Sequence, residues 1–224
     1  MGQYDGIKQQ VVDICLTLAG KGYLTGTGGN VSVRVLGQKM LAITPSNYDN
    51  KKMQTEDICI LGWDLTAIEG ARKPSVESAM HVAIYEHRLD VNVVIHTHQV
   101  YASALALINA PIPALFDEQV RFLGRSVEIV DYALSGTGFL KKNIASKLGN
   151  NANAYILQNH GALCLGADAE RTIFNVLLLE KCALTYLIAL CTEKKVTRIP
   201  LPLREMVFSM LRKDQRKASH RLKG

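Results

Sequence analysis

The chain has 224 residues, of which 48% are hydrophobic and 21% are charged, and its formal net charge is +6. This length fits one large domain, and the hydrophobic content supports a substantial core and excludes a disordered chain. Most of the excess charge lies in residues 204–224, which carry seven Lys or Arg and two Asp or Glu. One short basic tail without interleaved aromatic side chains favours a solvated helix over a nucleic-acid-binding face.

The cysteines and the apolar segments indicate where the protein works. The five cysteines are widely spaced and form no C-x-x-C motif, so we interpret them as small core residues in a reducing compartment. The first residues do not read as a signal peptide. The most apolar stretch, 173–191, carries Asn175, Glu180 and Lys181, which argues against a membrane span. We therefore expect a cytoplasmic protein with no membrane or nucleic-acid partner.

Hydrophobic periodicity predicts helices and strands that alternate along the chain. In the first half, the pattern predicts a helix at residues 7–18, strands at 31–35, 40–43 and 58–61, and a helix at 76–87. In the second half, it predicts strands at 91–95, 127–130 and 154–157, the last continued by 162–165, and helices at 101–107, 138–148 and 169–191. No internal repeat or interdomain linker interrupts this order.

The strand at 91–95 ends in two histidines, His96 and His98. Side chains two apart on a strand share a face, so both imidazoles point the same way. Two such nitrogens can bind one zinc ion. A pair of hydrogen-bonded histidines near a strand end explains the same spacing, and the spacing alone leaves both interpretations open.

Two further segments carry polar groups that suit a binding site. The glycine-rich run 26–30 precedes a strand, so it is not a dinucleotide or P-loop fingerprint. It fits either an anion site built from backbone N–H groups or a tight turn. Glu77 is expected in the first turn of its helix, where the helix dipole favours a carboxylate, and His81 lies one turn further on. The alternative for Glu77 is an exposed first-turn glutamate.

Five short motifs occur in a fixed order, and together they carry a family resemblance. They are Gly29-Asn30-Val31-Ser32-Val33-Arg34, Thr44-Pro45-Ser46, Pro74-Ser75-Val76-Glu77, Ile95-His96-Thr97-His98 and Asn159-His160-Gly161. The chain resembles the class II aldolase/adducin family from about residue 9 to residue 191, and within it most closely the L-fuculose-phosphate aldolases.

The resemblance implies a fold and an assembly. The expected fold is a single three-layer α/β/α domain with a central, largely antiparallel sheet, covering residues 1–203 and followed by a basic C-terminal tail at 204–224. The expected assembly is a homotetramer with active sites between neighbouring subunits.

The resemblance also implies site residues. His96, His98 and His160 would be ligands of one zinc ion per chain, with cobalt or manganese as alternatives. Glu77 would be the catalytic acid/base and a further metal ligand. The substrate's phosphate would be held by Thr27, Asn30, Ser46, Asn47 and Ser75.

The implied activity is zinc-dependent aldol cleavage in carbohydrate metabolism. A ketose phosphate such as L-fuculose 1-phosphate would give dihydroxyacetone phosphate and an aldehyde, with zinc stabilising the enediolate. Three alternatives share the scaffold: a pentulose-phosphate 4-epimerase, a sugar-acid-phosphate decarboxylase, and a non-catalytic interaction domain like the adducin head. The epimerases carry an aspartate at the position of Glu77, which counts against the first of these.

Three positions depart from the aldolase pattern. Val76 stands where the aldolase has a second phosphate-binding serine, and Asn47 stands where it has a glycine. Asp117 falls near the place of a catalytic tyrosine that reaches into the neighbouring subunit's site. Asp117 is therefore a candidate for the second proton donor.

Overall fold

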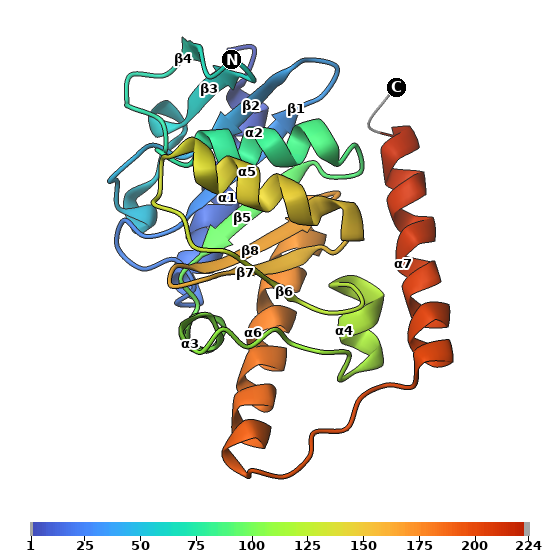
Figure 1. Cartoon of the computed structure of the whole chain (residues 1–224). Helices are drawn as coiled ribbons and strands as arrows, with labels where there is room; N and C mark the ends of the chain where they lie inside the picture. The colour runs from blue at the N-terminus through green and yellow to red at the C-terminus, as the bar shows by residue number, and fades with distance from the viewer. Residues whose placement is uncertain (1, 222–224) are drawn as a thin grey trace.

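A central β-sheet organises the molecule (Figure 1). The computed structural model describes residues 2–221. Within this range the sheet has eight strands in the order β4-β3-β2-β1-β5-β8-β7-β6, and every neighbouring pair is antiparallel except β6 and β7. The strands are β1 (Asn30–Val35), β2 (Met40–Ile43), β3 (Cys59–Gly62), β4 (Ala67–Glu69), β5 (Val93–Thr97), β6 (Glu128–Val130), β7 (Ala154–Leu157) and β8 (Gly161–Gly166).

Helices cover both faces of the sheet, and each face has its own hydrophobic core. Helices α2 (Ser78–His87) and α5 (Gly138–Lys147) lie on one face, and α1 (Asp5–Gly20), α3 (Val100–Leu107) and α6 (Ala169–Cys191) lie on the other (Figure 1). The predicted three-layer α/β/α domain with a largely antiparallel sheet is therefore confirmed.

Strand β5 lies at the centre of the sheet, between β1 and β8. Its side chains alternate between the two cores, with Val93 and Ile95 on the α1, α3 and α6 side and Val94 on the α2 and α5 side. A continuous apolar run is what a strand buried on both faces requires. The strand thus carries His96 into the buried centre of the sheet, and His98 follows the strand at its exposed end.

The prediction that residues 162–165 continue the strand at 154–157 is wrong. The two segments are the antiparallel strands β7 and β8, in which Leu157 pairs with Gly161. Asn159 takes a left-handed backbone (φ 53°), a conformation that asparagine tolerates in tight turns. The chain therefore reverses at His160, which lies in the turn of a hairpin.

Other differences from the predicted elements are local. The short strand β4 and the short helix α4 (Asp117–Phe122) were not predicted, since each is too brief to show a period. Helix α2 begins at Ser78, so Glu77 is the residue just before it. Cys191 is exposed, unlike the other four cysteines, which are buried as expected.

Helices α6 and α7 close the chain. Among the described residues, α6 is the helix long and apolar enough to cross a membrane. It packs on β5, β8 and α3 and buries Val176, Leu179 and Cys182, so it serves here as a core helix. Helix α7 (Leu201–Arg221) packs Phe208 and Leu211 against α4. The predicted boundary between residues 203 and 204 falls inside α7, and the division there stays a prediction.

Candidate metal centre and active site

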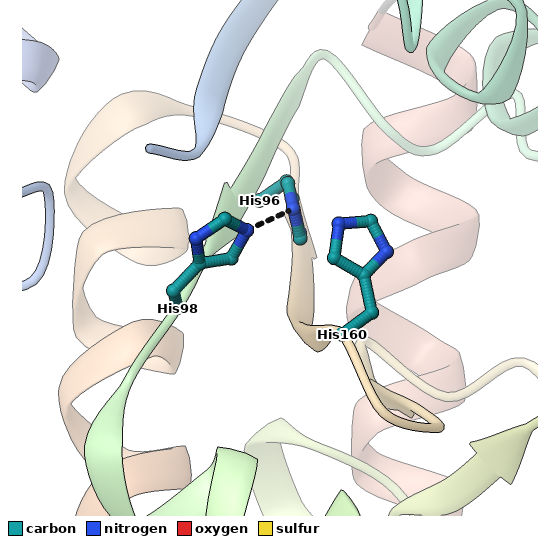
Figure 2. A group of neighbouring side chains, drawn as sticks. All are labelled: His96, His98 and His160. Atoms are coloured by element: carbon teal, nitrogen blue, oxygen red, sulfur yellow. Dashed lines mark hydrogen bonds between the residues drawn. The ribbon is translucent and has the colours of Figure 1, made fainter. Parts of the chain in front are cut away.

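Three histidines converge at the end of β5 (Figure 2). His96 is on β5, His98 follows the strand, and His160 comes from the β7–β8 turn. The Nε2 atoms of His96 and His98 are 3.1 Å apart, and one ring nitrogen of each of the three residues lies within 4.8 Å of the others. This cluster brings together the three histidines that the sequence motifs singled out.

Glycines allow the three segments to approach one another. A Cβ on Gly161 would collide with the carbonyl oxygen of Thr97 and lie 2.9 Å from Cδ2 of His98. Gly29 has a left-handed backbone (φ 75°), and a Cβ there would lie 2.5 Å from the carbonyl oxygen of His96. The glycines of the Asn-His-Gly and Gly-Asn motifs are thus required where the hairpin and the loop touch the end of β5.

The buried ring of His96 is fixed in one tautomer by its backbone partner. Its Nδ1 lies 2.9 Å from the carbonyl oxygen of Ala162, which accepts only, so Nδ1 carries the proton and Nε2 keeps a free lone pair. Burial lowers the pKa of His96 to about 4 and also lowers the pKa of His98. At neutral pH both imidazoles are therefore uncharged, which is the form that binds a metal ion.

Glu77 completes the cluster. Its side chain is buried, with Oε2 at 3.4 Å from Nε2 of His96 and Oε1 at 3.2 Å from Nε2 of His160. Burial by itself raises the pKa of the Glu77 carboxyl, but His96 and the hydrogen bond from Asn30 outweigh it and hold that pKa well below its usual range. The Asn30 amide donates to Oε2 at 2.7 Å and favours the ionised form of the carboxylate.

The donor set fits a divalent cation. Among residues 2–221, the buried Oε1 of Glu77 has no hydrogen-bond partner, and a buried carboxylate oxygen left unpaired is costly. The same oxygen lies 3.2 Å from Nε2 of His160, at the edge of the histidine cluster. Three imidazoles and one carboxylate are the ligands that zinc and related ions prefer. The Glu77 position follows from the residue's place just before α2, not from a hydrogen bond to the helix backbone.

Four of the five residues expected to bind phosphate, Thr27, Ser46, Asn47 and Ser75, lie in loops. The turn at 44–47 runs beside residues 73–75, where Ser46 N–H donates to the Lys73 carbonyl (2.9 Å) and Ser75 N–H donates to the Thr44 carbonyl (3.1 Å). Asn47 has a left-handed backbone (φ 52°), consistent with a turn position that also suits glycine. Thr27 is exposed in the glycine-rich loop.

Asn30 has a different environment from the other expected phosphate ligands. It is buried, and its amide joins Glu77 to His81, whose Nε2 lies 2.5 Å from the Asn30 Oδ1. Sequence reasoning gave His81 no role. The signal in the sequence is the spacing of two pairs of polar residues: Glu77 and His81 are four apart at the start of the helix, and Asn30 and Ser32 are two apart on the strand.

Asn50 is a second residue that sequence reasoning missed. Its amide donates to the carbonyl oxygens of Gly26 (3.1 Å) and Gly28 (3.0 Å) and so holds the glycine-rich loop in place. No motif contains Asn50. Asp117, the candidate second proton donor, is exposed at the first residue of α4, which packs on α6 and α7.

Comparison with known proteins agrees with this geometry. The family model of the Class II Aldolase and Adducin N-terminal domain matches residues 9–187. An L-fuculose phosphate aldolase of Escherichia coli is 34% identical over 190 residues, which cover 85% of this chain and 86% of the relative. One of Methanocaldococcus jannaschii is 35% identical over 187 residues (84% and 99%). A 5-deoxy-D-ribulose 1-phosphate aldolase of Bacillus thuringiensis is 34% identical over 180 residues (80% and 83%).

Solved structures show the same fold. A structure of L-fuculose 1-phosphate aldolase superposes with a TM-score of 0.87 at 30% identity, covering 92% of this chain and 96% of that one. The chain is therefore a metal-dependent carbon–carbon lyase of the class II aldolase type. It belongs to the class II aldolase/adducin family, as the resemblance implied, and the family implies a divalent metal ion.

Proposed function

We propose that His96, His98, His160 and Glu77 hold one divalent ion, zinc in the first place. The observation that carries this proposal is the cluster of three imidazoles beside the Glu77 carboxylate, whose unpaired Oε1 lies 3.2 Å from Nε2 of His160 and whose Oε2 lies 3.4 Å from Nε2 of His96. When bound, such an ion supplies Lewis-acid chemistry, which draws electrons from a substrate carbonyl as a carbon–carbon bond breaks.

The chain's own residues supply positioning and proton transfer. Glu77 is the base and acid that moves a proton at the reacting carbon, because it is an ionised carboxylate held in a buried site. The loops that carry Thr27, Ser46, Asn47 and Ser75 present backbone N–H, hydroxyl and amide donors for a phosphate. Binding of that remote phosphate orients the reacting carbon beside Glu77.

We propose L-fuculose 1-phosphate as the substrate, cleaved to dihydroxyacetone phosphate and lactaldehyde. The support is the name and identity of the relatives from Escherichia coli and Methanocaldococcus jannaschii. The Bacillus thuringiensis relative supports a second candidate, 5-deoxy-D-ribulose 1-phosphate, which would give the same ketone and acetaldehyde. Both are six- or five-carbon ketose 1-phosphates that end in a methyl group.

The test is a product assay on purified, zinc-loaded protein. We expect dihydroxyacetone phosphate from at least one of the two ketose phosphates, and the aldehyde identifies which. The matching unphosphorylated ketoses serve as controls for the role of the phosphate. Absence of cleavage of either phosphate at full zinc loading would overturn the proposed activity.

We further propose that the protein works as a homotetramer in the cytoplasm. Helix α3 begins two residues after His98, and its surface residues Val100 and Leu107, with the adjacent Ile108, are exposed apolar side chains. Apolar patches of this kind suit a subunit contact. A contact at this place would border the metal site, and Asp117 of a neighbouring subunit is our candidate for the second proton donor.

A further inference from the structure

A line of buried polar side chains runs from Glu77 into the space between β1 and α2. Asn30 Nδ2 is 2.7 Å from Glu77 Oε2, Asn30 Oδ1 is 2.5 Å from His81 Nε2, and His81 Nδ1 is 2.7 Å from Ser32 Oγ. Ser32 Oγ is in turn 2.8 Å from the hydroxyl of Tyr85. Side chains of this line are at most 5% exposed, so water does not replace any of these contacts.

Secondary structure places these groups opposite one another. Asn30 and Ser32 are two apart on β1 and point to the same face of the sheet. His81 and Tyr85 are four apart on α2 and lie one above the other on the same side of the helix. The line therefore alternates between residues of β1 and residues of α2, and it ends at the Glu77 carboxylate just before α2.

The hydrogen bonds in this line have one direction. An ionised carboxylate accepts only, so Asn30 must turn its NH₂ to Glu77 and its carbonyl oxygen to His81. His81 must then carry its proton on Nε2 and accept on Nδ1, because burial lowers its pKa to about 3 and leaves it one ring proton. Ser32 in turn donates to Nδ1 and accepts from the Tyr85 hydroxyl. Every bond thus donates toward Glu77.

The opposite His81 tautomer would break this arrangement. A lone pair on Nε2 would face the Oδ1 of Asn30, and two acceptors would repel each other at 2.5 Å. Asn30 would then turn over and present its oxygen to the carboxylate, where the same repulsion would push Glu77 away. The His81 proton therefore determines which way the Asn30 amide faces.

We propose that His81 is a positioning residue that acts through the amide of Asn30 to fix the rotation of the Glu77 carboxylate. Holding Oε2 against Asn30 aims the unpaired Oε1 at the histidine cluster, 3.2 Å from Nε2 of His160. This inference rests on the proposed role of Glu77. The polar side chains buried between β1 and α2 then do more than pair with one another, because they also position the carboxylate that moves the proton.

The first experiment observes the tautomer directly in the unmodified protein. Nitrogen-15 NMR of histidine-labelled, metal-free protein at pH 7 distinguishes protonated from unprotonated ring nitrogens. The signals of His81 are assigned as those lost in His81→Gln. We expect the proton on Nε2 and none on Nδ1. A proton on Nδ1 or on both nitrogens would overturn the inference without any mutant having to be active.

The second experiment separates positioning from packing. Glutamine can donate from its amide to Asn30, and leucine cannot, so we compare His81→Gln with His81→Leu. With cobalt in place of zinc, the visible spectrum reports the ligands around the ion. We expect His81→Gln to keep the parent spectrum and kcat within about threefold. We expect His81→Leu to change the spectrum and lower kcat on the order of 10-fold, with a smaller change in KM.

A matched control measures the effect of lost stability alone. Val82→Ala creates a cavity on the same helix at a buried residue that the site does not use. It should lower Tm and leave kcat and the cobalt spectrum unchanged. If a folded His81→Leu protein keeps the parent kcat and cobalt spectrum, His81 has only a structural role and the inference is overturned. If no substrate is cleaved, the tautomer and the cobalt spectrum still decide this inference separately from the proposed activity.

Discussion

At the scale of single residues, the site combines neutral imidazoles with an ionised carboxylate. Burial keeps His96 uncharged, and the Asn30 amide keeps Glu77 charged. A neutral imidazole and a charged carboxylate can lie side by side here because each group has its own hydrogen-bond partner. His96 donates to the Ala162 carbonyl, and Glu77 accepts from Asn30.

We predict that His96→Ala removes most of the bound metal. His96 is the fully buried histidine of the cluster, whereas His98 and His160 are more exposed. The metal content, measured by elemental analysis after dialysis, should fall from about one ion per chain to well below half an ion per chain. His87→Ala, on an exposed residue of α2, should keep full loading. Full occupancy in a folded His96→Ala protein would remove it from the ligand set.

We predict that Glu77→Gln keeps the fold and most of the metal but lowers turnover about 10²-fold or more. Glutamine has the same shape as glutamate and cannot accept the proton from the reacting carbon. Turnover and metal content are measured together on the same preparation. Glu86→Gln, at an exposed position of α2, is the matched control. Turnover within a few-fold of the parent at full loading would contradict the role of Glu77.

Stability should fall as the pH is lowered, because of the buried histidines. The ordinary pKa of 6.5 applies to the unfolded chain, whereas in the fold the pKa is about 3 for His81 and about 4 for His96. The unfolded state therefore binds protons first, and the stabilisation present above pH 6.5 is lost as the pH falls toward 4. Each histidine contributes up to about 1.4 kcal/mol per pH unit.

Denaturant unfolding of the metal-free protein between pH 7.5 and pH 5 checks this dependence. The lower limit stays above the ordinary pKa values of carboxyl groups, so the histidines contribute most of the slope. His81→Gln should show a shallower slope than the parent. An unfolding free energy that stays constant across this range would contradict the assignment of neutral, buried histidines.

At the scale of secondary-structure elements, three backbone segments meet within van der Waals distance at the end of β5. The β7–β8 hairpin and the glycine-rich loop both press against residues 96–98, and Gly29 and Gly161 leave the necessary space. The hairpin carries His160, and β1 carries Asn30. The proposed metal ligand His160 and the Glu77 partner Asn30 are thus positioned by contacts between backbones, which side chains at these glycines would prevent.

We predict that Gly161→Ala weakens metal binding by moving the hairpin away from β5. The added methyl group would meet the Thr97 carbonyl and the His98 ring, so the strand must shift, at a cost of about 1–3 kcal/mol in unfolding free energy. Titration calorimetry of the metal-free protein measures the loss of affinity. Gly149→Ala is the control, since a Cβ there meets nothing within 4 Å. Equal affinities of the two variants would contradict this account of the Asn-His-Gly motif.

At the scale of the whole molecule, the histidine cluster lies where β5 ends and α3 begins, beside exposed apolar side chains. Helix α7 lies at the C-terminal end of the described chain. It is held to the domain by the buried side chains of Phe208 and Leu211 and by two ion pairs, Arg121 with Asp214 and Arg125 with Glu205. The basic C-terminal segment, as far as Arg221, is therefore packed against its own domain.

We predict a homotetramer at micromolar concentration, measured by light scattering. The exposed residues of α3 supply the apolar surface, and a charged substitution there should split the assembly. Leu107→Glu should lower the mass without unfolding the chain, because Leu107 is 68% exposed. Leu65→Glu, at an exposed turn residue, is the control. A parent protein that stays monomeric with full activity would contradict the tetramer and the sharing of sites between subunits.

The sequence by itself determined most of the elements and the residues of the metal cluster. Helical and strand periods are local properties of the chain, so α1, β1, β5 and α6 could be placed from spacing alone. The pairing of His96 with His98 also follows from spacing, because both belong to one strand end. His160 and Glu77 came from the order of motifs and not from any physical contact that the sequence displays.

Only the tertiary structure decided how these parts meet. The hairpin at His160 looked like one continuing strand, since apolar residues on both sides of a three-residue turn give no change of period. The role of Asn30 as a phosphate ligand stays a prediction, and the fold adds that its buried amide joins Glu77 to His81. Such contacts join β1 to α2 across long stretches of chain, and hydrogen bonds between distant segments leave no periodic trace in the sequence. The folded sheet and its helices therefore determine the direction in which the Glu77 carboxylate is held.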